Sequence, residues 1–129
     1  MSRGLLLFAH GARDPRWALP FEDVAQRIRV LRPGVALELA FLDFMSPDLP
    51  EAGRRLAAAG CRTVEVLPLF LGAGGHVRKD LPELLALLAA RHPAVQWRLQ
   101  ASIGEADAVV AAMAGEALRV LAAQDVEGR

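Results

Sequence analysis

The sequence has little of several features that mark other classes of protein. Its single cysteine, Cys61, excludes an internal disulfide and a cysteine-based zinc cluster. Fifteen basic and fifteen acidic side chains cancel, which argues against nucleic-acid binding through bulk electrostatics. No apolar run is long enough for a signal-peptide core or a membrane span. These absences predict a cytoplasmic protein without nucleic-acid or membrane partners.

The length and the distribution of apolar residues predict one α/β domain over residues 1–129. Hydrophobic residues make up 53% of the chain, enough to bury one core. Strands are predicted over residues 5–9, 35–42, 63–71 and 95–100. Helices are predicted over 19–31, from an N-cap at Asp48 to Gly60, from Asp80 to His92, and from a Ser102–Glu105 capping box onward. This alternation predicts a flavodoxin-like, four-stranded parallel sheet of order 2-1-3-4, with helices on both faces.

Three polar residues follow three successive predicted strands. His10 follows the first strand, Asp43 follows the second, and His76 lies in the loop after the third. Taken alone, each histidine could be a capping or packing residue, and Asp43 could be a solvated loop acid. Ligands of such sheets bind beyond the carboxyl ends of the strands, where this topology brings all three residues together. They therefore predict a site for a divalent ion such as cobalt, iron, nickel or zinc.

The glycine-rich loop 72–75 before His76 is not a known nucleotide-binding motif. It lacks the glycine-lysine-serine/threonine ending of a Walker loop and the spacing of the dinucleotide fingerprint, so no nucleotide is predicted. Gly74 and Gly75 permit a substrate to approach the backbone closely.

Four cations lie in the two loops that carry the histidines. They are Arg13, Arg16, Arg78 and Lys79. These side chains are either a solvated surface or a rim that holds an anionic ligand, for which arginine is well suited. Around two imidazoles, such a rim fits a large, flat polycarboxylate.

Three blocks of the chain together resemble one known family. They are residues 5–15 (LLLFAHGARDP), 41–48 (FLDFMSPD) and 66–77 (VLPLFLGAGGHV). They are similar to the short-form, CbiX/SirB-like class II chelatases of tetrapyrrole biosynthesis, the sirohydrochlorin cobaltochelatase/ferrochelatase family. The resemblance implies a lyase that inserts Co²⁺ or Fe²⁺ into sirohydrochlorin without ATP, in cobalamin or siroheme biosynthesis.

The resemblance also implies roles for particular residues and an assembly. His10 and His76 match the family's two metal-binding, catalytic histidines, and Asp43 falls where an acidic ligand is expected. Larger family members join two such halves in one chain, whereas this chain has a single half, so the resemblance implies a homodimer. The apolar loop residues Phe44, Met45 and Leu71 are candidate contacts between the two copies. No iron–sulfur cluster is expected.

Two other functions stay open at this point. One is a non-catalytic metal or tetrapyrrole carrier that uses the same site. The other is a histidine-type phosphohydrolase, which the sequence disfavours because Ala9 stands where those enzymes place an arginine.

Overall fold

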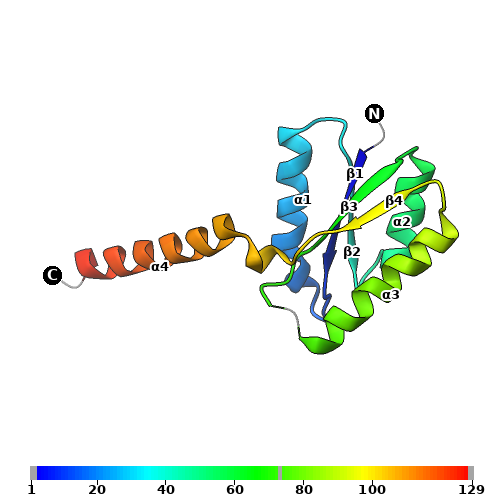
Figure 1. Ribbon diagram of the computed structural model, residues 1–129. Coiled ribbons are helices and arrows are strands. Elements are labelled where there is room, and N and C mark those ends of the chain that lie inside the picture. Colours follow the sequence, from blue (N-terminus) through cyan, green and yellow to red (C-terminus); the bar gives the residue numbers. More distant parts are fainter. Residues whose placement is uncertain (1–2, 73, 128–129) are drawn as a thin grey trace.

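Four parallel strands form the sheet on which the chain is built (Figure 1). The computed structural model describes residues 3–72 and 74–127, and the side chains of all of these except 75–78 and 124–127. The strands are β1 (Arg3–Ala9), β2 (Ala36–Phe41), β3 (Thr63–Pro68) and β4 (Gln96–Leu99). Their order is β2-β1-β3-β4 with every pair parallel, which confirms the predicted topology.

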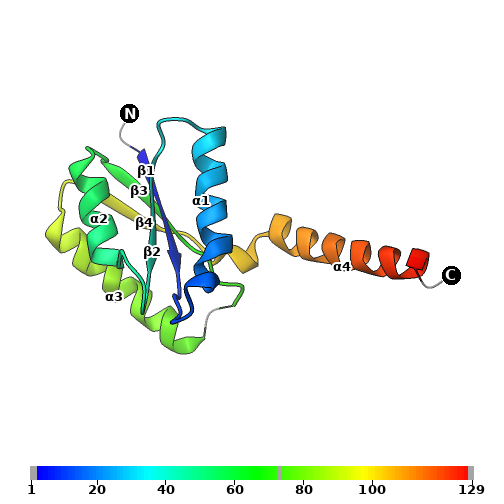
Figure 2. The ribbon, with the colours of Figure 1, turned by 180° about the vertical axis from the view of Figure 1, so that it is seen from behind.

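Successive side chains of β1 point into two separate parts of the core. Leu6 and Phe8 pack with α2 (Leu49–Ala58) and α3 (Gly75–Arg91) on one face of the sheet. Leu7 packs with Ala25 of α1 (Leu19–Leu31) on the other face. The two faces are thus covered by helices, as the uninterrupted apolar run of β1 predicts for a strand buried on both sides (Figures 1 and 2).

Helix α3 begins earlier than the sequence predicts. An Asp80 N-cap was the expectation, but the helix starts at Gly75 after the extended residue Gly74 and contains Pro82 within it. Aspartate with proline two residues later is a typical helix start, yet α3 keeps Pro82 in its interior, on its exposed side, where the proline removes one backbone hydrogen bond. His76 therefore lies in the first turn of α3, and its expected place in a loop was wrong.

The capping box predicted at Ser102 is also wrong, whereas the Asp48 cap is confirmed. The Asp48 carboxylate accepts a hydrogen bond from the Glu51 amide at 3.0 Å. Ser102 makes no side-chain cap and precedes a short 3-10 helix, η2 (Ile103–Glu105), so the last helix, α4, begins only at Asp107. A serine and a glutamate three residues apart fit the start of either kind of helix.

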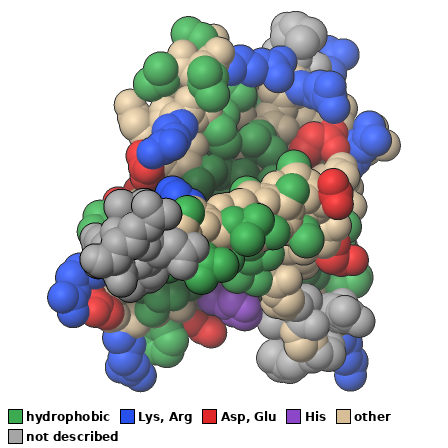
Figure 3. All heavy atoms as spheres, turned by 90° about the vertical axis from the view of Figure 1, so that its left-hand side faces the viewer, with side chains coloured by type: hydrophobic (Ala, Val, Ile, Leu, Met, Phe, Trp, Pro, Cys, Tyr) green, Lys and Arg blue, Asp and Glu red, His purple; other side chains and the backbone are tan. Residues whose placement is uncertain are grey.

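Helix α4 (Asp107–Glu127) extends away from the sheet instead of covering it (Figures 1 and 2). Among its described side chains, Val109 is half-buried and the others are exposed. Hydrophobic side chains consequently gather on the side of the molecule toward which α4 projects (Figure 3). No helix in the described part of the chain is long and apolar enough to cross a membrane.

Cys61 and His92 both lie in structural surroundings away from the candidate site. Cys61 is buried, and burial raises the pKa of its thiol. His92 forms the C-cap of α3, and its ring centre lies 5.9 Å from that of Trp97.

Candidate functional site

The carboxyl ends of β1 and β2 bring His10 and Asp43 side by side. The parallel pairing continues one step past each strand, because the Leu42 amide donates to the Ala9 carbonyl at 2.9 Å. The Asp43 amide then donates to the His10 carbonyl at 3.0 Å. Both side chains are exposed at this edge. The topology therefore places two potential metal ligands where the sequence predicted them.

The imidazole of His10 lies against a buried aromatic ring. Its centre is 4.2 Å from that of Phe70, and the two planes are tilted by 34°. Phe70 is only 2% exposed and also contacts Phe8 in the core. One side of the His10 imidazole is thus packed against Phe70, while the rest of the His10 side chain is exposed and accessible to ligands. A neutral imidazole held in this way can bind a metal ion or accept a proton.

Phe70 is a site residue that sequence reasoning did not assign. It comes two residues after Pro68, where β3 ends, and it points to the same face as Val66 and Phe8. The alternation of buried residues along β3 could have indicated that face, but not the contact with His10.

A second aromatic ring lies beside a cation at the same edge. Phe44 has a left-handed backbone, with φ of 67°, and is 64% exposed. The Arg13 guanidinium carbon lies 4.7 Å from the centre of the Phe44 ring, a cation–π distance. The loop after β1 and the loop after β2 are therefore joined by side chains as well as by backbone.

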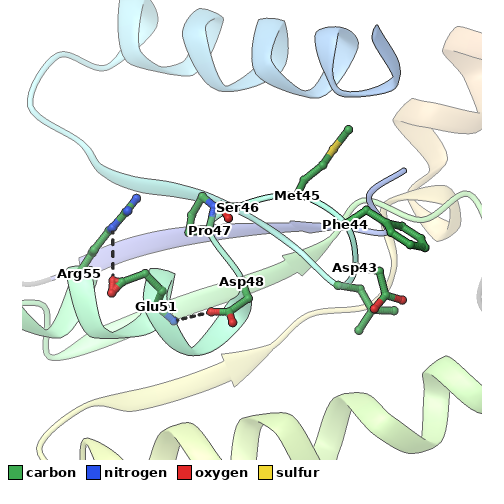
Figure 4. Close-up of a pocket in the computed structure, with 9 residues that line it drawn as sticks. Asp43, Phe44, Met45, Ser46, Pro47, Asp48, Glu51 and Arg55 are labelled. Atoms are coloured by element: carbon green, nitrogen blue, oxygen red, sulfur yellow. Dashed lines mark hydrogen bonds and ion pairs between the residues drawn. The ribbon is translucent and has the colours of Figure 1, made fainter. Parts of the chain in front are cut away.

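A pocket of about 480 Å³ lies beneath the loop after β2 (Figure 4). Asp43 and Phe44 lie at one end of it, and Glu51 and Arg55 of α2 lie at the other. Arg55 forms an ion pair with Glu51 at 3.7 Å and with Glu38 of β2 at 3.2 Å. Arg55 is therefore already paired with two carboxylates, one of which, Glu51, also pairs with Arg54 at 2.7 Å.

Arg16, which the sequence assigned to the anion-binding rim, is engaged locally. Its guanidinium forms an ion pair with the Asp14 carboxylate at 2.9 Å, and Asp14 also accepts from the Arg16 amide at 2.9 Å. Hydrogen bonds from Arg16 lower the pKa of Asp14, and the same carboxylate raises the pKa of Arg16. The Asp14 carboxylate thereby caps the 3-10 helix η1 (Pro15–Ala18), which directly precedes α1 at the end of the loop that links β1 to α1.

The remaining predicted site residues lie at the N-terminus of α3. Gly74 is the N-cap, and the backbone of His76 follows in the first turn. The side chains of Arg78 and of His76, the third ligand of the predicted metal site, lie outside the described part of the structure. Among the described side chains, no three His, Cys, Asp or Glu residues form a cluster that could hold a metal ion.

Comparison with known proteins identifies both a family and a fold. The family model CbiX matches residues 4–119. A crystal structure of a CbiX protein from Marinobacter aquaeolei VT8 matches with a TM-score of 0.76 and 32% identity, covering 98% of this chain and 99% of that one. The sirohydrochlorin chelatase SirB from Bacillus subtilis subspecies spizizenii, solved in complex with cobalt, also has a TM-score of 0.76 at 24% identity. That match covers 87% of this chain and 48% of SirB, and shows a shared fold.

Curated relatives match over a shorter stretch. The sirohydrochlorin cobaltochelatase of Sulfurisphaera tokodaii is 38% identical over 84 residues, which are 64% of this chain and 67% of that protein. The enzyme of the same name from Methanococcus maripaludis is 30% identical over 83 residues, or 64% and 58% of the two chains. The chain thus spans about two thirds or less of the length of these relatives.

Proposed function

The chain belongs to the CbiX family, and on that basis we propose that it is an ATP-independent chelatase that inserts Co²⁺ into sirohydrochlorin. The observation that carries the proposal is the exposed imidazole of His10, packed on Phe70 and adjacent to Asp43 at the carboxyl edge of the sheet. The names of the curated relatives support cobalt as the metal and sirohydrochlorin as the tetrapyrrole.

The chemistry of metal insertion requires what this edge offers. Two pyrrole protons must leave the ring, and the ion must exchange its water ligands for ring nitrogens. In the proposal, His10 and His76 divide the tasks of holding the incoming ion and accepting a proton, with Asp43 as a further ligand. The ion is a substrate, so a site with few protein ligands suits its release to the ring.

Several finer features belong to the same proposal. We propose that Arg13, Arg16 and Arg78 bind the peripheral carboxylates, and that the backbone at Gly74 and Gly75 lies against the ring. The proposal also includes Fe²⁺ as an alternative metal and a role in siroheme formation. It further includes a cytoplasmic location and assembly as a homodimer. The exposed apolar side chains of Phe44 and Leu71 support a contact between copies near the site.

Multiple turnover separates this enzyme from a carrier with the same site. Catalytic amounts of protein are mixed with metal-free sirohydrochlorin and Co²⁺, and the visible spectrum is followed beyond the uncatalysed rate. Many turnovers per chain support the chelatase. Binding that stops at one equivalent per chain would instead identify a metal or tetrapyrrole carrier.

Substitution of the histidines tests the site itself. His10→Ala and His76→Ala should each lower turnover by about 10²-fold or more, the scale of lost acid–base assistance. If the two act as one unit, the double variant should be little worse than either single variant. His92→Ala is the matched control, because His92 lies at the C-terminal end of α3. Full activity in either single variant would contradict the proposed site.

A further inference from the structure

Phe44 combines a large exposed side chain with a backbone conformation that favours glycine. Its φ is 67°, in the left-handed region, and the residue is 64% exposed. No other non-glycine residue in the described part of the chain has a positive φ. A bulky residue rarely adopts this conformation, because its Cβ atom then lies close to the following carbonyl oxygen. The phenylalanine is therefore strained here, and burial in the core does not offset the strain.

The turn around Phe44 is fixed by contacts on two sides. The Met45 amide donates to the Asp43 carbonyl at 2.8 Å, which closes a three-residue turn with Phe44 at its centre. Turns of this size with a positive φ at the central residue are rare and strained. The Asp43 carbonyl also lies so close to Gly11 that a Cβ atom on Gly11 would clash with it. The strained turn is thus held by the loop after β1 as well as by its own hydrogen bond.

The ring of Phe44 is held in one orientation but stays largely open. The Arg13 guanidinium lies over the ring and is attracted to that face. Figure 4 shows the side chain pointing away from Met45 and Pro47 in the same loop. Every other phenylalanine and both tryptophans are buried or half-buried, and the chain has no tyrosine. Phe44 is therefore the one phenylalanine or tryptophan ring that this protein exposes.

This ring lies at the edge of the sheet that carries the candidate metal ligands. Phe44 directly follows Asp43, and Arg13 comes three residues after His10 in the neighbouring loop. A tetrapyrrole is much wider than one side chain, so a macrocycle centred on these ligands also covers the residues beside them. Flat conjugated rings are attracted to the faces of aromatic side chains, in addition to the gain from apolar burial.

We propose that Phe44 is a substrate-binding residue whose ring stacks on the plane of the tetrapyrrole, with Arg13 holding the ring in place. The assignment rests on the proposed function and adds to it a contact for the face of the macrocycle, whereas the cations bind its rim. This contact is the same before and during metal insertion, so it strengthens substrate binding without altering the reacting atoms. Strain retained at a functional site explains an exposed phenylalanine where glycine would be less strained.

Binding of metal-free sirohydrochlorin tests the assignment directly. Phe44→Asn is the main variant, because asparagine tolerates the left-handed backbone and has no aromatic ring. Its dissociation constant, measured by absorbance titration, should rise about 10-fold or more, the scale of a lost stacking contact. In the chelatase assay KM should rise by a similar factor with kcat nearly unchanged. Phe44→Trp, which keeps a flat ring, should bind as tightly as the unaltered chain.

Urea unfolding separates a role in binding from a role in stability. Phe44→Asn should leave the unfolding midpoint unchanged or raise it, because asparagine relieves the strain of the turn. Leu31→Ala is the control for the loss of exposed apolar surface. Leu31 is 84% exposed at the C-terminal end of α1, at the opposite edge of the sheet, so its replacement should not change the affinity.

Three results would overturn the stacking role. The first is a Phe44→Asn variant that binds sirohydrochlorin as tightly as the unaltered chain, and the second is a Phe44→Trp variant that binds as weakly as Phe44→Asn. The third is a change of oligomeric state in Phe44→Asn, seen by light scattering, with the affinity unchanged, which would make Phe44 a contact between copies.

The titration also distinguishes the stacking role from the proposed chelatase activity. Turnover by the unaltered chain, together with undiminished binding by Phe44→Asn, would keep the chelatase and remove the role of Phe44. Weakened binding by Phe44→Asn, together with no turnover by the unaltered chain, would keep the stacking contact in a tetrapyrrole carrier.

Discussion

Gly11 is the point at which the backbone of the predicted site tolerates no side chain. Its φ is +85°, and a Cβ atom there would lie 1.9 Å from the Asp43 carbonyl oxygen. Gly11→Ala therefore incurs a left-handed backbone cost of about 1 kcal/mol. It also forces the two loops apart, which breaks the hydrogen bond from the Asp43 amide to the His10 carbonyl. The clash displaces the Asp43 carbonyl as well, which breaks the hydrogen bond that this carbonyl accepts from the Met45 amide. At about 1 kcal/mol each, these losses bring the expected destabilisation to about 3 kcal/mol.

Gly34 supplies the matched control for this substitution. Its φ is +83°, almost the same as at Gly11, but nothing lies within 4 Å of a Cβ atom there. Gly34→Ala should therefore cost only the backbone contribution of about 1 kcal/mol. Urea unfolding followed by circular dichroism gives both free energies of unfolding. Equal losses in the two variants would refute the reasoning that the Asp43 carbonyl excludes a side chain at Gly11.

Three further variants test local interactions. Asp48→Ala should lower the free energy of unfolding by about 1 kcal/mol in urea melts, because it removes the N-cap of α2. Arg13→Ala, which frees the ring of Phe44, should raise KM more than it lowers kcat in the chelatase assay, since the proposed function assigns to Arg13 a contact with peripheral carboxylates. Arg16→Ala should move the titration of the Asp14 carboxyl in NMR spectra to higher pH, because Arg16 holds that pKa down. The depressed pKa means that the pair stabilises the fold above the ordinary aspartate pKa near 4, and that this contribution is lost as the pH falls through the lowered value.

The apolar pattern of the sequence determined the topology and one side of the candidate site. Short apolar runs separated by amphipathic stretches are local signals, and parallel strands joined by right-handed crossovers allow few arrangements. The strand order follows from these rules, and with it the meeting of His10 and Asp43 at one edge. The Asp48 cap was equally predictable, because an N-cap depends only on residues within one turn of the helix.

Only the tertiary structure decided where helices begin and what covers each surface. The start of α3 at Gly75 and the delayed start of α4 depend on contacts that compete with a local capping signal. The packing of His10 on Phe70 joins residues 60 positions apart, and no periodicity in the chain encodes it. Helix α4 leaves the sheet shortly after Gly104, which packs closely against the backbone of Leu71. The exposed apolar side chains of α4, such as Val110, Met113 and Leu121, do not identify a surface that covers them, because an amphipathic pattern carries no information about the chain against which it packs.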